Sequence, residues 1–197
     1  MFMLENLLKY KIILASNSPR RQELLAGLDI CFEVKTIPDI DESYPENLKK
    51  EEIPIFIAKQ KAEAYRKFLE CNTLLITADT IVWLDGKIYG KPENEQEAKE
   101  MVKILSGQTH EVITGVCLTT LNKQITFYVL SKVKFAGLQE EEVDYYVKKY
   151  KPFDKAGAYG VQEWIGYIGV EKIEGCFYNV MGLPVMALYK YLKEWDS

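Results

Sequence analysis

Apolar positions along the chain fall into short continuous runs that alternate with segments of helical spacing. Runs of this kind predict buried strands, and a spacing of about 3.6 residues predicts amphipathic helices. The predicted strands cover residues 11–15, 73–78, 111–120, 124–135 and 165–173. The predicted helices cover residues 19–28, 51–70, 95–105, 139–150 and 185–192. This order predicts an α/β fold, a mixed sheet with helices packed on it, within a single domain over residues 1–197.

Two short polar sequences predict turns between strands. Asp85-Gly86 separates two short apolar runs, which is the pattern of a tight hairpin. Asn122-Lys123 separates the two long β-rich runs, which we therefore expect to be antiparallel neighbours. No linker or repeat interrupts the chain, so we expect its motifs to serve one shared site.

Composition and charge narrow the class of protein. The chain is 48% apolar and 27% charged, which is typical of a folded, soluble domain. It carries 25 basic and 29 acidic residues, and no long basic block, so a nucleic-acid polymer is not an expected partner. The cysteines are too far apart in sequence to suggest a zinc site, and we expect buried free thiols in a reducing compartment. They are Cys31, Cys71, Cys117 and Cys176.

The sequence also suggests a location in the cell. The N-terminal segment lacks the basic region and the small-residue end of a secretory signal. The longest charge-free stretch, residues 175–189, is too short for a membrane span and contains Gly182 and Pro184. We therefore expect a cytoplasmic protein with no membrane partner.

The segment Ser16 to Arg21 follows the first strand and begins the first helix. Ser18 suits the N-cap and Pro19 the first helical position, but Arg20 and Arg21 occupy positions where acidic side chains are preferred. Their charges become favourable if an anion such as a phosphate binds there, held by backbone N–H groups, serine hydroxyls and guanidinium groups. The alternative is two solvated arginines over an ordinary turn.

Two carboxylates and one lysine are further candidates. Asp79 follows the strand predicted at 73–78, and ligands of open α/β sheets gather beyond the carboxyl ends of strands. Glu42, in an acidic stretch, is the candidate for a second carboxylate. Lys61 lies on the inner face of its helix, where a lone ammonium needs a partner or an anion. The alternatives are an aspartate that caps a turn and a solvated acidic loop.

Three other residues have both a structural and a functional interpretation. Lys91 follows the predicted hairpin at a rigid corner and is, taken alone, an ordinary surface lysine. His110, the single histidine, more often fastens a turn than catalyses, and it cannot form a histidine-based metal cluster alone. Gln162 ends a segment rich in small residues, 154–162, where it either reads a base edge or is a satisfied amide of a sharp loop.

Taken together, these segments resemble the Maf family of nucleoside triphosphate pyrophosphatases over nearly the whole chain. The matching pieces, in order, are SNSPRR at 16–21, DE at 41–42, AKQKA at 58–62, ADT at 78–80, GKP at 90–92, SGQTHEVITGV at 106–116, DKAGAYGVQ at 154–162 and NVMGLP at 179–184. The resemblance implies the elongated mixed sheet with a central cleft of Maf and ITPase-like folds. It also implies hydrolysis of a nucleoside triphosphate to a monophosphate and pyrophosphate, with a divalent cation such as Mg²⁺ or Mn²⁺, and a homodimer as a family-level expectation.

The resemblance also implies residue roles. Asp79 resembles the catalytic acidic residue, acting as general base or as a metal ligand that orients water, and Glu42 resembles the metal-associated acid. The residues that resemble phosphate-handling cations are Arg20, Arg21, Lys61 and Lys91. The set typical of the branch that acts on dTTP and UTP is matched by Arg20, Thr80 and Gln162.

Three expectations remain open on the sequence alone. Glu163-Trp164 stands where we expect a glycine-bearing sequence in the family, so the wall beside the base differs here. A non-enzymatic nucleotide-binding regulator of septum formation is one alternative function. A pyrophosphatase for methylated GTP or a non-standard purine nucleotide is another.

Overall fold

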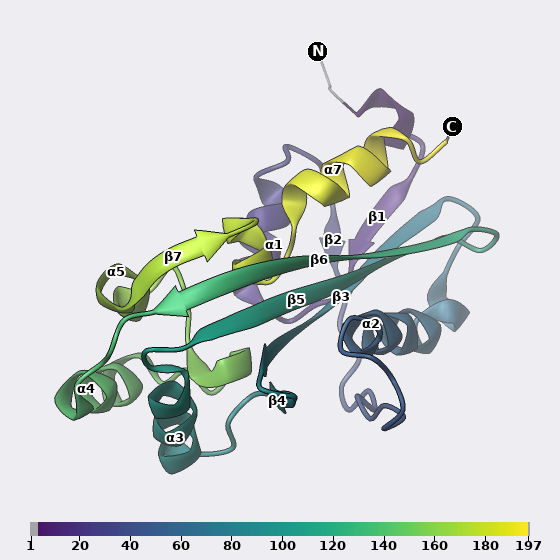
Figure 1. Ribbon diagram of the computed structural model, residues 1–197. Coiled ribbons are helices and arrows are strands. Elements are labelled where there is room, and N and C mark those ends of the chain that lie inside the picture. Colours follow the sequence, from purple (N-terminus) through teal and green to yellow (C-terminus); the bar gives the residue numbers. More distant parts are fainter. Residues whose placement is uncertain (1–3, 197) are drawn as a thin grey trace. The chain divides into compact units, whose positions relative to one another are not determined.

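The computed structural model describes residues 4–196 (Figure 1). The strands are β1 (Lys11–Leu14), β2 (Glu33–Val34), β3 (Thr73–Leu84), β4 (Lys87–Tyr89), β5 (Thr109–Thr119), β6 (Gln124–Phe135) and β7 (Val170–Glu174). The α-helices are α1 (Pro19–Ala26), α2 (Glu52–Ala64), α3 (Glu95–Leu105), α4 (Glu140–Tyr150), α5 (Trp164–Gly169), α6 (Phe177–Met181) and α7 (Val185–Lys193). Short 3-10 helices cover Glu5–Leu7, Arg66–Phe68 and Ala156–Ala158.

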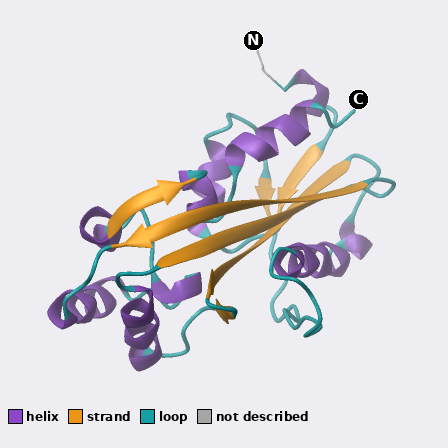
Figure 2. Ribbon diagram, in the orientation of Figure 1, coloured by secondary structure: helices purple, strands orange, loops and turns teal. Residues whose placement is uncertain are grey.

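Within the described residues, seven strands form one mixed sheet (Figure 2). The strand order is β2-β1-β3-β5-β6-β7, and β4 pairs with β3. β1 is parallel to β2 and to β3, whereas β4 is antiparallel to β3 and β7 is antiparallel to β6. The expected mixed sheet with helices is confirmed.

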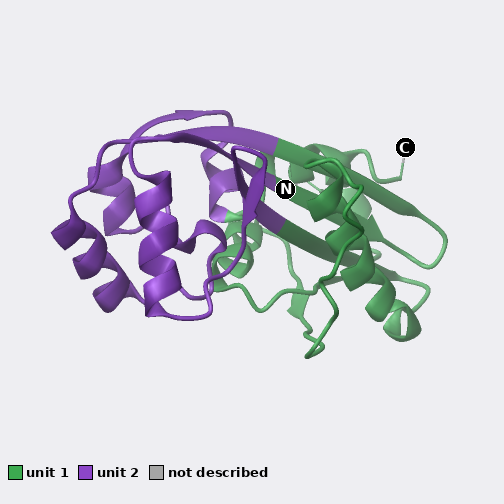
Figure 3. Cartoon of the chain, turned by 60° about the horizontal axis from the view of Figure 1, so that its bottom comes forward, with its two compact units in different colours: residues 1–79, 114–129, 182–197 green, residues 80–113, 130–181 purple. Residues whose placement is uncertain are grey.

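The chain divides into two compact units (Figure 3). Unit 1 comprises residues 1–79, 114–129 and 182–197, and unit 2 comprises residues 80–113 and 130–181. Three of the boundaries fall inside β3, β5 and β6, so these strands contribute residues to both units.

Each unit has its own apolar core. In unit 1, α2 packs on β1 and β3 through a cluster that includes Ile13, Ala58, Ala62 and Leu75. In unit 2 a larger cluster joins α3, α4 and the adjoining parts of the strands, with Phe135 among its fully buried side chains. No helix within residues 4–196 is long and apolar enough to cross a membrane.

The predicted end of the second strand was wrong. β3 continues past Ala78 and includes Asp79, because residues 80–84 (TIVWL) are again favourable in a strand. The hairpin at Asp85-Gly86 is confirmed: both residues have positive φ, 49° and 80°, and Val82 pairs with Tyr89 across it. Asp79 therefore lies inside a strand, and not at its end.

The strand predicted at 165–173 was only partly right. Residues 164–169 form α5, and the strand β7 covers 170–174. Ile165 and Gly169 are buried one helical turn apart, and a Cβ on Gly166 would lie 1.8 Å from the Val161 carbonyl oxygen. The close backbone contact made possible by Gly166 favours the compact helical turn.

Two smaller expectations also need correction. The helix predicted at 51–70 ends at Ala64 and is followed by a 3-10 turn. The cysteines are free as predicted, but Cys31 and Cys71 are exposed, and Cys176 is only half-buried. The helix α6 was not predicted, since its five residues are too few for a periodic pattern.

Candidate active site

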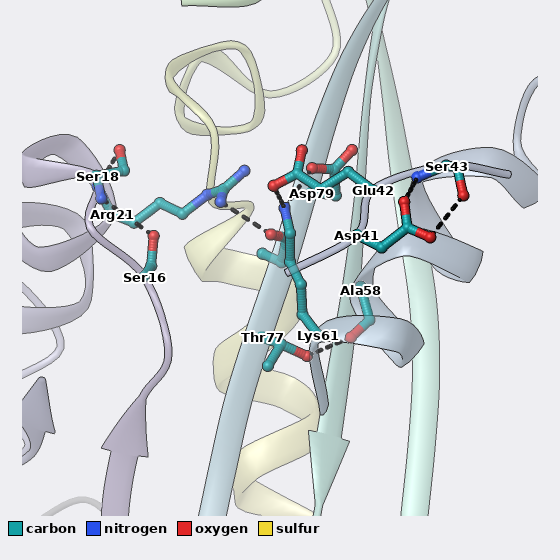
Figure 4. A network of polar contacts seen from close by, with 11 residues as sticks. Ser16, Ser18, Arg21, Asp41, Glu42, Ser43, Ala58, Lys61, Thr77 and Asp79 are labelled. Atoms are coloured by element: carbon teal, nitrogen blue, oxygen red, sulfur yellow. Dashed lines mark hydrogen bonds and ion pairs between the residues drawn. The ribbon is translucent and has the colours of Figure 1, made fainter. Parts of the chain in front are cut away.

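Three ionised side chains meet in unit 1 (Figure 4). The Lys61 ammonium lies 2.7 Å from Asp79 Oδ1 and 3.0 Å from Glu42 Oε1. The Lys61 and Asp79 side chains are each 12% exposed, whereas that of Glu42 is 46% exposed. The lysine on the inner face of α2 thus has the partner that its position demanded.

The register of α2 against β3 positions this cluster. Thr77 Oγ1 donates a hydrogen bond of 2.7 Å to the Ala58 carbonyl oxygen. Asp79 is two residues farther along the strand, on the same face as Thr77, and Lys61 is three residues after Ala58, on the same face of the helix. The buried hydrogen bond between Thr77 and Ala58 therefore positions the ion pair between Asp79 and Lys61.

The segment after β1 forms the helix start that the sequence predicts. The Ser18 side chain caps α1 by accepting from the Arg21 backbone N–H at 3.4 Å, with Pro19 at the first helical position. The Ser18 N–H donates to Ser16 Oγ at 3.2 Å, and Ser16 is buried. Arg20, at the second helical position, is half-buried.

Arg21 has a structural role in addition to its expected one. Its Nε donates to the Gly182 carbonyl oxygen and its Nη1 to the Ala78 carbonyl oxygen, each at 2.8 Å. Ala78 directly precedes Asp79, so Arg21 fixes the backbone that carries the carboxylate. Burial lowers the pKa of the Arg21 guanidinium, although arginine stays charged at any working pH.

The other predicted residues belong to unit 2. Thr80 is half-buried in β3 and Lys91 is exposed just after β4. The Gly157 N–H donates to the Gly90 carbonyl oxygen at 3.0 Å, which links the corner of Lys91 to the segment that leads to Gln162. The Gln162 Oε1 is buried without a hydrogen-bond partner among the described residues, which argues against the satisfied-amide interpretation.

His110 belongs to the core of unit 2. It lies in β5, is fully buried, and its Nε2 is 2.7 Å from the Tyr159 hydroxyl. Burial lowers its pKa from 6.5 to about 4, so it is neutral at physiological pH. This packing role agrees with the structural interpretation, although His110 contacts Tyr159 in the segment that leads to Gln162 and does not fasten a turn.

Known proteins are similar to this chain over nearly its full length. The family described as Maf-like protein matches residues 11–195. The chain belongs to this family. A Phocaeicola vulgatus protein named dTTP/UTP pyrophosphatase is 62% identical over 192 residues, covering 98% of this chain and 100% of that protein. A Porphyromonas gingivalis protein of the same name is 56% identical over 197 residues, covering 99% of each chain.

A solved structure also aligns with this Maf-like chain. It is a nucleoside-triphosphatase / dITP/XTP pyrophosphatase from Mycobacterium abscessus, at 14% identity and a TM-score of 0.41. The alignment covers 94% of this chain and 96% of that one.

The carboxylates of this Maf-like chain suit one kind of metal site. No group of three potential His, Cys, Asp or Glu ligands occurs within residues 4–196. Glu42 and Asp79 nevertheless converge on one cation, the Lys61 ammonium. Mg²⁺ is commonly held by one or two carboxylates together with water and substrate phosphates. The two acids fit that kind of site, and an all-protein metal cage does not fit.

Sequence reasoning gave no role to several residues that hold the candidate residues of their own unit in place. The Gly182 carbonyl oxygen, which holds Arg21, lies in the quoted motif NVMGLP, and its residue has a φ of 116°. Tyr146, Lys155 and Glu163 form a polar network beside Gln162. A tyrosine among the buried positions of α4 was a signal, because a buried phenol needs a hydrogen-bond partner.

Proposed function

We propose that this Maf-like protein hydrolyses dTTP and UTP, each to the monophosphate and pyrophosphate. The observation that carries the proposal is the convergence of Asp79 and Glu42 on the Lys61 ammonium, in a chain 62% identical over nearly its full length to a protein named dTTP/UTP pyrophosphatase. The reaction breaks the anhydride link between the α and β phosphates, consumes one water molecule, and releases the nucleoside monophosphate and pyrophosphate. Its role would be housekeeping of the nucleotide pool.

Asp79 is the proposed general base. Its carboxylate is mostly buried and is held at a fixed place by Lys61. A carboxylate so placed accepts a proton from attacking water, or orients that water. Lys61 holds the carboxylate in place and contributes positive charge close to the phosphates.

Positive side chains are the proposed phosphate ligands. A triphosphate carries about four negative charges, and the whole chain has a net charge of −4, so the cations that bind it must be gathered locally. Arg20 and Arg21 lie in the first turn of α1, where the helix dipole also favours an anion. The same role, stabilising charge on the phosphoryl group and on departing pyrophosphate, is proposed for Lys61 and for Lys91.

Glu42 and Asp79 are the residues that would hold a divalent cation, Mg²⁺ or Mn²⁺. When bound, such an ion supplies charge neutralisation and polarisation of the phosphoryl oxygens. The homodimer and the cytoplasmic location expected from the sequence stay predictions.

Base recognition is the role proposed for Gln162 and Thr80, and the resemblance to the family adds Arg20 to this set. Uracil and thymine carry an N–H at position 3, and cytosine does not. The unpartnered Gln162 Oε1 is an acceptor suited to that N–H, which supports a preference for UTP and dTTP.

The experiment is pyrophosphate release from a nucleotide panel in the presence of Mg²⁺. The panel contains UTP, dTTP, CTP, ITP and methylated GTP, with Asp79→Asn as the test variant. Removal of the general base lowers kcat by about 100-fold or more with UTP and dTTP. Circular dichroism checks that the variant is folded.

Asp39→Asn is the matched control. Asp39 is an exposed acid with a φ of 54°, a conformation that asparagine tolerates. It should keep the wild-type rate. Wild-type turnover by folded Asp79→Asn protein removes the assigned role. Absence of pyrophosphate release from every nucleotide favours the regulator, and a clear preference for ITP or methylated GTP favours another branch.

A further inference from the structure

The loop that carries Gln162 is fastened on both sides by one phenol. The Tyr146 hydroxyl, on α4, accepts from the Gly160 N–H at 3.0 Å and donates to Glu163 Oε2 at 2.5 Å. Gly160 lies two residues before Gln162, and Glu163 directly follows it. The backbone around Gln162 is thereby tied to a fully buried side chain of the unit 2 core.

A second cation completes the network. Lys155 Nζ lies 3.0 Å from Glu163 Oε1 and 2.8 Å from Asp154 Oδ1, and the Lys155 side chain is 9% exposed. The Glu163 side chain is 19% exposed, so this ion pair is largely shielded from water. A buried pair of this kind is costly to break on one side, because the remaining charge loses its partner.

The packing of the loop leaves little freedom. A Cβ on Gly160 would lie 2.7 Å from the Glu163 carboxyl carbon, so the loop closes tightly over its own acid. Ala158, just before, has a φ of 56°, which is uncommon for a residue with a side chain. Strained backbone of this kind persists where its surroundings hold it in place.

The Gln162 side chain requires a rigid loop, because one of its buried polar atoms is unpaired within residues 4–196. Its buried Oε1 has no hydrogen-bond partner among the described residues. A loose loop would rotate this oxygen toward water, since a buried acceptor without a donor is unfavourable. The network keeps the acceptor in place before a ligand arrives, which lowers the cost of ordering it on binding.

We propose that Tyr146, Glu163 and Lys155 form a clamp that positions Gln162 and thereby sets nucleotide selectivity. The clamp residues are positioning residues: they act on the base through Gln162. The inference rests on the proposed hydrolysis of UTP and dTTP. It also gives a role to Glu163, which departs from the expected family pattern.

The Tyr146 phenol keeps its proton around neutral pH. Burial, followed by the hydrogen bond to Glu163, raises the pKa of Tyr146 far above its ordinary value. The phenol therefore remains a donor at neutral and mildly alkaline pH.

The test compares Tyr146→Phe with Tyr150→Phe. Tyr150 lies on the same helix and stacks on Tyr146, with ring centroids 5.2 Å apart, so its variant controls for loss of a hydroxyl from α4. Steady-state kinetics with UTP and CTP give KM, kcat and the ratio of kcat/KM values. Tyr146→Phe should raise KM for UTP about tenfold, leave kcat within about twofold, and lower the preference for UTP over CTP about tenfold.

Glu163→Gln is the conservative variant. It keeps an acceptor for the Tyr146 hydroxyl, and although it removes the charge that faces Lys155, that lysine keeps its ion pair with Asp154. Its change in KM and in selectivity should lie between those of wild type and Tyr146→Phe. Tyr150→Phe should match wild type in both.

Amide hydrogen exchange of residues 156–164 measures how firmly the clamp holds this loop in the absence of nucleotide. Exchange there should be faster in Tyr146→Phe than in Tyr150→Phe or wild type. Equal exchange in the three proteins overturns the clamp. A fall in rate that is uniform for UTP and CTP, with KM and selectivity unchanged, shows a merely structural role and also overturns the inference.

The two proposals fail in distinguishable ways. Wild-type protein that releases no pyrophosphate refutes the proposed function and the selectivity role with it, and exchange still decides whether the clamp holds the loop. Active wild type with unaltered selectivity in Tyr146→Phe refutes the clamp alone.

Discussion

His110 should make the stability of the protein depend on pH in a calculable way. It is fully buried between aromatic rings, with Phe135 and Tyr159 at centroid distances of 5.1 and 5.3 Å. Burial lowers its pKa from 6.5 to about 4. In the unfolded chain the imidazole titrates near its ordinary value, so the unfolded state binds more protons between these two pH values.

The sign and size follow from this difference. Above about pH 6.5 the imidazole is neutral in both states and contributes nothing to the pH dependence. As pH falls from 6.5 toward 4, protonation favours the unfolded state, and below 4 the loss levels off. A gap of about 2.5 pKa units corresponds to a loss of about 3 kcal/mol in the free energy of unfolding, of which most is present at pH 4.5.

The assay compares wild type with His110→Gln by urea unfolding at pH 7 and pH 4.5. Carboxylates titrate in both proteins, so their effects cancel in the difference between them. The stability of wild type relative to His110→Gln should fall by about 2 to 3 kcal/mol between the two pH values. Because the chain contains one histidine, its ring resonance can also be followed directly by NMR. A midpoint near 6.5 in the folded protein, or an unchanged difference in stability, refutes the reasoning.

Two further predictions concern the supports of the candidate site in unit 1. Gly115→Ala places a Cβ 2.4 Å from the Pro54 carbonyl carbon at the start of α2, so it should lower the free energy of unfolding in urea by about 1 to 3 kcal/mol. The control Gly137→Ala, with no atom within 4 Å of its Cβ, should leave that free energy unchanged. Equal unfolding curves for the two variants would contradict the importance of this contact. Arg21→Lys keeps the charge but loses the planar donors to Gly182 and Ala78, so it should lower the stability by about 1.5 to 3 kcal/mol in the same assay, and a stability equal to wild type would show that these two bonds are dispensable.

Local signals predicted most of the fold. The helix at 95–105 matches α3 at both ends, because Asn94 caps it and its apolar positions recur with the helical period. The hairpin at Asp85-Gly86 needs positive φ at both residues, and glycine and aspartate tolerate it. These features depend on neighbours in sequence, so the sequence alone is sufficient.

The errors occurred where contacts distant in sequence decide the structure. An aspartate after an apolar run suggests a strand end, yet Asp79 continues β3, and its side chain pairs with Lys61 from another element. The segment 164–169 is rich in residues that favour strands, yet a close contact between Gly166 and the Val161 backbone accompanies a helical turn. Such contacts produce no periodic pattern in the sequence, so the sequence alone does not predict them.

The candidate site was predicted in parts, and for the same reason. The helical spacing of α2 placed Lys61 on the inner face, and burial of an ammonium required a partner. That the partner is Asp79 followed only from the register of two elements. The Tyr146 network could not be read from the sequence, because its members come from a helix and from two separate loop positions.

Fold and proposed chemistry share one contact surface in unit 1. Thr77 and Asp79 project from the same face of β3, and Ala58 and Lys61 from the same face of α2. The neutral bond from Thr77 to Ala58 is fully buried, so it fixes the register without any ligand. That register brings the ammonium within 2.7 Å of the carboxylate, one turn of helix farther on. A slip of one residue in β3 would turn Asp79 to the other face, so the sheet that stabilises the protein also determines where the proposed general base lies.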